Sequence, residues 1–337
     1  MAYLMDFADL SPSKKVSAII ELFLEKNPTF AMIPFSNNPQ MRVEWFTEKS
    51  LPTTAFRGTG DSYTASKSTQ NKNFLTLMKW GGTTNLDHKE ARIMGVDLRN
   101  ARAREVAMLM KSVRLDSVYN LIHASNDANP KAFDGIYALI DKMDPITAGG
   151  TDEGTINLKY TGATNANGVA LGVDASVIVG EIDRLIDACI STPTFMYVPR
   201  WIQRQLRAVA LDTAANNALA GLFVNMPFNY SVNGRSYTAY GLMYDNRVPM
   251  FDPGINSSGT NIMDFTEDWG SGTGVCASMV AVVAGENDFL FYQDQPPEIL
   301  EYESADKLTI GDTIDWALAP APQSLTSVVR MRGIKKA

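Results

Sequence analysis

The chain has 337 residues, of which 45% are hydrophobic and 20% charged, and a formal net charge of −7 at pH 7. This length suits one large domain or two modest ones, each with a buried core. The negative charge indicates that the chain as a whole is not built to bind polyanions, although a local basic surface remains compatible with it. No apolar run approaches the roughly 20 residues that cross a bilayer, and residues 1–10 lack the pattern of a secretory signal. We expect a protein made in the cytoplasm without membrane contact.

Residues typical of metal and nucleophilic catalysis are scarce. Cys189 and Cys276 are the only cysteines, and His88 and His123 are the only histidines. They are too few and too scattered for a disulfide framework or a clustered zinc site. The glycines of residues 269–275 lack the spacing and the following helix of a dinucleotide loop, and no phosphate loop or nucleophile elbow is present. The sequence therefore predicts no catalytic, cofactor-binding or metal site, and no cofactor.

The first predicted element is a short amphipathic helix over residues 11–27. Ser11 and Pro12 suit its cap and first turn, apolar residues then repeat at helical spacing, and Pro28 cannot continue the helix. A short helix near a terminus is stable only when it docks on something. A neighbouring subunit would provide such a surface.

A long polar segment follows between two predicted strands. Residues 41–46 alternate like a strand, and residues 74–80 read as a second one. Residues 50–73 between them contain few large apolar side chains and cannot pack a core of their own. We expect an arm that becomes ordered on a partner; a mobile surface loop is the alternative.

Residues 87–125 predict one long helix. Asp87 is a plausible N-cap with Glu90 three residues on, and only Gly95 weakens the pattern. A narrow apolar stripe runs along the helix, Arg92, Arg99 and Arg102 share another face, and further basic residues lie on a third. The rod would span a broad, thin molecule; a long helix in a bundle is the alternative.

The remainder predicts two helices and many strands. Residues 174–190 and 200–212 read as helices on either side of an apolar strand at residues 194–198. Asn233-Gly234 marks a hairpin turn. Further strands are expected at residues 247–251, 279–284, 289–292, 298–302, 313–318 and 327–331.

The order of these elements resembles the Hong Kong 97-type fold, which the major capsid proteins of tailed bacteriophages share with encapsulins. In that family an N-terminal arm precedes an extended β-hairpin loop and a long spine helix, and an axial domain and closing strands follow. The local matches are the turn Phe133-Asp134-Gly135-Ile136 after the spine, residues 194–206 for the axial strand and helix, and residues 241–250 for a strand region of the axial domain.

The resemblance implies an α+β fold with five parts. These are an N-terminal arm (1–38), an extended loop (39–86), the spine helix of the peripheral domain (87–134), an axial domain (135–275), and closing strands of both domains (276–337). It also implies a function: a structural, non-enzymatic head protein that assembles through pentamers and hexamers into an icosahedral shell in the host cytoplasm and ends up in the virion.

The implied partners are other copies of the chain, packaged double-stranded DNA held without sequence preference, and separate scaffolding, portal and decoration proteins. Because few residues precede the loop, we expect no built-in scaffold: either the scaffolding is a separate protein or none is used. The assembly-interface candidates are aromatic anchors and basic residues of the loop and spine: Trp45, Phe46, Phe56, Lys67, Lys72, Trp80, Arg92, Arg99 and Arg102. Packing on the subunit's own body is the alternative for the aromatic residues. Some relatives cross-link a loop lysine to an asparagine of a neighbour, but here no partner is evident for Lys67 or Lys72, which read as solvated lysines. An encapsulin-type compartment and an unrecognised α+β enzyme are the alternatives.

Overall fold

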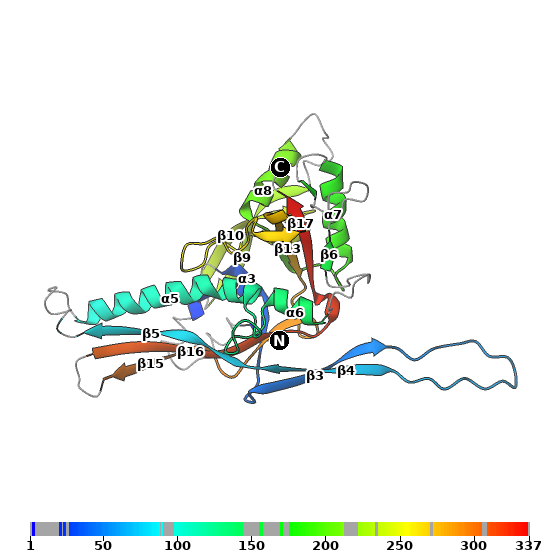
Figure 1. The fold of residues 1–337 in the computed structure, drawn as a ribbon, viewed down its shortest axis with the longest axis horizontal. Coiled ribbons are helices and arrows are strands. Elements are labelled where there is room, and N and C mark those ends of the chain that lie inside the picture. Colours follow the sequence, from blue (N-terminus) through cyan, green and yellow to red (C-terminus); the bar gives the residue numbers. More distant parts are fainter. Residues whose placement is uncertain are drawn as a thin grey trace.

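The structure is a computed structural model, and it describes residues 2–3, 20–21, 23–24, 27–87, 89, 98–143, 155–157, 169–170, 175–211, 222–232, 235–269, 272–304 and 309–335. Figure 1 shows three parts of the molecule: a long layer in which a helix lies along a sheet, a β-rich upper part that stands on this layer, and a two-stranded hairpin that projects beyond both. The long axis of the molecule therefore runs along the layer and the hairpin.

The sheet of the long layer has six strands. Its order is β1 (Ala2–Tyr3), β2 (Pro34–Asn37), β14 (Phe289–Gln293), β16 (Thr309–Pro322) and β15 (Glu298–Glu303), and β5 (Met78–Asp87) pairs with the other side of β16. The helix α5 (Leu98–His123) runs alongside β5 in Figure 1. With 26 residues, α5 is about 39 Å long at 1.5 Å per residue.

Alternating burial explains how the helix and the sheet fit together. Along β5 the side chains alternate between half-buried and exposed, as expected for a strand with one covered face. A Cβ atom on Gly82 would lie 2.8 Å from a methyl group of Leu109, so the helix approaches the sheet closely here. The rings of Trp80 and Trp316 lie 6.3 Å apart on neighbouring strands.

The upper part contains a nine-stranded sheet and two helices. The sheet order is β6 (Thr155–Asn157), β17 (Val328–Lys335), β13 (Gly272–Val282), β8 (Phe195–Tyr197), β11 (Val248–Phe251), β10 (Arg235–Tyr244) and β9 (Phe223–Val232); β12 (Glu267–Trp269) pairs with β13, and β7 (Val169–Ala170) pairs with β17. The helices are α7 (Ala175–Asp187) and α8 (Arg200–Leu211). Each has one apolar face: Ile182 and Leu185 of α7, and Ile202 and Leu206 of α8, are fully buried in the same core as the sheet.

The hairpin consists of β3 (Arg42–Ser50) and β4 (Thr69–Thr76), which pair only with each other. Val43 and Leu75 near its base are buried in the main core, whereas residues 51–67 beyond the strands are exposed. Three short helices complete the described structure: α3 (Pro28–Met32), α6 (Ile136–Met143) and a 3₁₀ turn (Leu325–Ser327). None of the helices in the described ranges is long and apolar enough to cross a membrane.

One boundary differs from the predictions. The strand predicted at residues 74–80 is divided, because Leu77 is fully buried and its amide bonds to the carbonyl of Met41 at 2.8 Å; β4 ends before it and β5 begins after it in another sheet. Asn27 is not helical, in agreement with a helix that does not continue through Pro28. Pro28 instead starts the separate helix α3, which fits the preference of proline for a first helical turn.

Most of the remaining predictions for described residues are confirmed. Both helices of the upper part, the strand between them and the predicted closing strands are present, mostly with longer strands than expected. The carboxylate of Asp87 accepts a hydrogen bond from the amide of Lys89 at 2.6 Å, which is the bond that an N-cap makes, although Asp87 is also the last residue of β5. The predicted helix at residues 11–27 falls largely outside the described residues, as do positions 90–97 of the long helix.

Candidate functional site

The hairpin exposes an unusual amount of apolar surface for so few residues. Its outward side chains include Phe46 and Phe74, each 63% exposed, and its tip includes Phe56, which is fully exposed. A two-stranded hairpin that pairs with nothing else is only marginally stable in water. Aromatic residues rarely stay exposed in clusters unless they meet a partner. The hairpin is therefore the first candidate for an interaction surface.

Charged side chains share the same outward face of the hairpin. Lys72 forms an ion pair with Glu44 at 2.6 Å, and hydrogen bonding from Lys72 is the first cause of the lowered pKa of the Glu44 carboxyl. The guanidinium of Arg42 lies 4.5 Å from the ring centre of Phe74. Because these groups are exposed, their contribution to stability is small. They make the face both aromatic and charged; of these residue types, the aromatic residues and arginine are the ones enriched at interfaces.

The five predicted interface residues of the hairpin differ in their exposure to solvent. Phe46, Phe56, Lys67 and Lys72 are exposed, so they are accessible to a partner. Trp45 points the other way and packs against the core, and its buried indole nitrogen has no hydrogen-bond partner among the described residues. An interface role for these residues stays a proposal.

The other four predicted interface residues lie on the long layer. Trp80 is half-buried beside Trp316. Arg92 lies outside the described residues, and Arg99 is described only as part of the backbone of α5. Of the three arginines, only Arg102 has a described side chain, and its environment is within the subunit.

Arg102 connects α5 to β16 through a bidentate pair of hydrogen bonds. Its guanidinium donates to the two carboxylate oxygens of Asp312 at 2.7 and 2.6 Å, and Glu301 lies 3.3 Å away. The Asp312 side chain is only 4% exposed. This bonding raises the pKa of Arg102 above its ordinary value. The paired geometry fixes the helix on the sheet, because guanidinium and carboxylate match in shape.

The solvent-facing side of α5 carries cations without carboxylates. Ala103, Arg104, Ala107, Met108 and Lys111 are exposed there. In the described part of the chain, no ion pair involves Arg104 or Lys111. They lie seven residues apart, which is about 10 Å along a helix. The result is a narrow basic strip on a protein of negative net charge.

A buried polar cluster joins the long layer to the upper part. Arg330 of β17 is 5% exposed, lies 2.9 Å from Glu267, and stacks 3.4 Å from the ring centre of Tyr137 of α6. Tyr137 and Ser278 both donate hydrogen bonds to Glu267, and the Arg330 Nε donates to Ser278. Each polar side chain of the cluster thus has a hydrogen-bond or ion-pair partner within it, as a buried ion pair requires.

His123 extends this connection at the end of α5. Its Nε2 donates to the carbonyl of Ile262 at 2.6 Å, and its ring meets that of Tyr137 edge to face at 4.9 Å. Burial lowers the pKa of His123 and raises that of Tyr137. Both side chains are thus held neutral, and α5 and α6 are anchored to the upper part.

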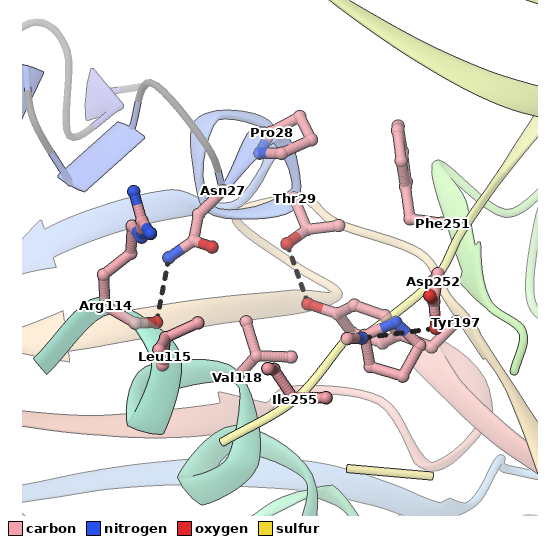
Figure 2. A pocket seen from close by; sticks show the side chains of 12 residues that line it. Asn27, Pro28, Thr29, Arg114, Leu115, Val118, Tyr197, Phe251, Asp252 and Ile255 are labelled. Atoms are coloured by element: carbon pink, nitrogen blue, oxygen red, sulfur yellow. Dashed lines mark hydrogen bonds between the residues drawn. The ribbon is translucent and has the colours of Figure 1, made fainter. Parts of the chain in front are cut away.

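A pocket of about 280 Å³ lies between α3, α5 and the loop at residues 252–255. Figure 2 shows Arg114 at one end of its lining and Asp252 at the other, with Val118 and Ile255 between them. Two hydrogen bonds hold its walls: Asn27 donates to the Arg114 carbonyl at 3.2 Å, and the buried Tyr197 hydroxyl donates to Thr29 at 2.8 Å. The pocket is therefore a formed feature with charged ends and an apolar middle.

Nothing described resembles a reaction centre. Among the described residues, no group of three or more His, Cys, Asp or Glu side chains is placed to hold a metal ion. Cys189 and Cys276 are both buried, and burial raises the pKa of the Cys189 thiol to about 12. At that value the thiol is protonated at neutral pH and a poor nucleophile.

Sequence reasoning missed the buried cluster and the pocket. Glu267 and Ser278 lie 11 residues apart on the paired strands β12 and β13, but Arg330 comes 52 residues after Ser278, so no local spacing links all three. The pocket draws on segments more than 200 residues apart. One signal was present for Arg330, since a charged residue in the apolar run at residues 328–334 needs a buried partner.

Comparisons with known proteins point to one fold. No family model matches the chain, and no curated protein matches it in sequence. Solved structures do match. A chain in the capsid of a native GTA particle is 10% identical, with a TM-score of 0.56 and coverage of 91% of this chain and 89% of that one. A chain of the procapsid of satellite phage P4, solved with its size determination (Sid) protein, is 10% identical, with a TM-score of 0.54 and coverage of 97% and 93%.

An encapsulin complex from Synechococcus elongatus PCC 7942 matches comparably, at 8% identity and a TM-score of 0.51, covering 90% of this chain and 86% of that one. The chain therefore has the mixed α+β, Hong Kong 97-type fold, as the order of its elements predicts. The likeness spans nearly the whole of each chain. It does not distinguish phage capsids from encapsulins.

Proposed function

We propose that this protein is a structural subunit that self-assembles into a closed shell, and more specifically the head protein of a tailed bacteriophage. The observation on which this depends is the projecting hairpin with its exposed aromatic face, on a chain whose fold matches shell proteins of capsids and encapsulins. A hairpin that cannot bury this face on its own body would bury it on a neighbouring copy.

The remaining features of the structure suit a rigid subunit of a shell. The bond between Arg102 and Asp312 and the cluster around Arg330 fix the helix, the lower sheet and the upper sheet to one another. A subunit of fixed shape can then hold the hairpin at a constant angle to the neighbouring subunit. In a shell each subunit makes several such contacts at once, so individually weak contacts add up to a stable particle.

The basic strip on α5 supports a nucleic acid as the content of the shell. Arg104 and Lys111 of every copy would neutralise phosphates without reading the sequence, and many copies around a cavity would multiply a weak contact. A protein cargo would not require this strip. Separate scaffolding, portal and decoration proteins, and a place in the virion after assembly in the host cytoplasm, belong to the same proposal.

The experiment is overproduction of the chain followed by negative-stain microscopy and nuclease treatment. We expect closed shells, tubes or rings of capsomers. A uniform monomer would contradict the shell function. Shells that assemble with packaging proteins should protect double-stranded DNA, and the Arg104→Gln/Lys111→Gln variant should retain less DNA at raised salt. Shells that enclose only a protein would favour the encapsulin-type compartment.

A further inference from the structure

The tip of the hairpin is held by its own hydrogen bonds, and among its exposed side chains is the ring of Phe56. The Arg57 guanidinium donates to the carbonyl of Asp61 at 2.8 Å, and the Gly58 amide donates to the Asp61 carboxylate at 3.1 Å. Gly60 has a φ of 101°, which suits only glycine and closes the turn. Phe56 beside this turn is 107% exposed. The turn therefore supports a phenyl ring that touches nothing on its own molecule.

The pocket between α3, α5 and residues 252–255 has the size and character to take such a ring. Its volume of about 280 Å³ exceeds the ~150 Å³ of an apolar cavity that accepts benzene. Leu115, Val118 and Phe251 contribute to its apolar middle, and Ile255 at its edge is 45% exposed. An aromatic side chain that entered would cover this exposed apolar surface.

The charges at the two ends of the pocket match those of the tip. The pocket has Arg114 at one end and Asp252 at the other (Figure 2). Within the described residues neither of them forms an ion pair. The tip has a cation next to Phe56, which is Arg57, and an anion in the same turn, which is Asp61. With the ring inserted, each charge of the tip could meet an opposite charge on the rim.

The hairpin cannot reach the pocket of its own molecule. Figure 1 shows β3 and β4 running away from α3 and α5, with the tip beyond the end of the long layer. The partner must therefore be another molecule. A second copy of this chain supplies the matching pocket.

We propose that Phe56 of one copy inserts into the pocket between α3 and α5 of a second copy, with Arg57 facing Asp252 and Asp61 facing Arg114. This proposal rests on the shell function and names the contact that the hairpin makes. Since every copy has both a tip and a pocket, the contact runs head to tail and can close into a ring.

Disulfide trapping tests the contact in the full-length protein. The variant Ala55→Cys/Ile255→Cys keeps Phe56 and places one thiol on the tip and one at the edge of the pocket, both at exposed positions. The native cysteines are buried and contribute little background. After shells assemble and are mildly oxidised, we expect the monomer band to be lost on a non-reducing gel and a ladder of covalent oligomers to appear, which a reductant reverses.

The matched control is Ala55→Cys/Asn287→Cys, whose second thiol lies at an exposed position lining a different hollow, between β2 and β14. It should remain monomeric on the same gel. Shells of normal size without a ladder from Ala55→Cys/Ile255→Cys, or an equal ladder from the control, would overturn the docking and leave the shell function standing. If the wild-type chain formed no shells, both proposals would fall together.

A charge exchange gives a second readout. Arg57→Asp alone should slow assembly, followed by light scattering, and the added Asp252→Arg should restore it. Failure of the double variant to recover, with an unchanged melting temperature, would also overturn the docking.

Discussion

Loss of the Glu267 charge should destabilise the protein far more than a surface substitution does. The Arg330 side chain is 6% exposed and that of Glu267 18%, and they lie 2.9 Å apart. Glu267→Gln keeps the shape of the side chain but leaves Arg330 buried without a counter-charge. Breaking a buried pair in this way costs about 3–5 kcal/mol. Because Arg330 keeps its contacts with Ser278 and Tyr137, we expect the lower end, about 3 kcal/mol.

Arg330→Met should cost less, about 2 kcal/mol, because Glu267 keeps two hydrogen-bond donors and some contact with water. The double variant has neither charge buried, so we expect it to cost about 2–3 kcal/mol, well below the sum of the single effects. Urea unfolding followed by tryptophan fluorescence measures these free energies. It should use a background in which residues 51–68 are replaced by a two-residue turn, so that assembly does not contribute.

This reasoning would be refuted if the loss of stability in the double variant equalled the sum of the losses in the two single variants within about 0.5 kcal/mol. Such additivity would mean that the two charges do not depend on each other. The anchoring of α6 to the upper part would then require another explanation.

Three further predictions concern the connections of α5. Arg102→Met should lower the free energy of unfolding by about 3 kcal/mol in the same urea assay, because it leaves Asp312 buried and unpaired, whereas Arg104→Met at an exposed position should change it by less than about 0.5 kcal/mol; equal effects would contradict the assignment. The pKa of His123 in the folded protein is below its ordinary 6.5, so on acidification the unfolded chain takes up this proton first. The free energy of unfolding should therefore decrease as the pH falls from 6.5 through the folded pKa. The His123→Gln variant should lose less stability between pH 7.5 and pH 5.5 in melting curves, and an identical loss would exclude His123 as the cause. Gly135→Ala should lower the melting temperature, since a Cβ there would lie 2.6 Å from the carbonyl oxygen of Asn120, a clash of the kind that costs about 1–3 kcal/mol; an unchanged melting temperature would contradict the close packing.

The sequence predicted those elements whose patterns are local. Residues 174–190 have a clear apolar face, Pro199 suits the start of α8, and alternating residues indicated most of the strands of both sheets. The polar stretch at residues 50–73 between strands indicated an arm. These features depend on neighbours in the chain, and so one sequence is enough to recognise them.

Features that depend on distant residues were not predictable in the same way. Nothing local to Leu77 indicates that the chain changes sheets there, because its neighbours on both sides favour strands. Arg102 reads as a surface arginine, and only the position of Asp312, 210 residues later, reveals its role. The pocket likewise exists only once α3, α5 and the loop after β11 have met.

Assembly of the chain with a shortened hairpin tests the central claim most directly. Replacing residues 51–68 by Asn-Gly should keep β3 and β4 paired, because Ser50 and Thr69 already face each other and Asn-Gly favours a two-residue turn. We expect a folded protein with an unchanged melting temperature that remains in small species in sedimentation velocity, under conditions in which the full-length chain forms shells. Shells of normal size from the shortened chain would contradict the account.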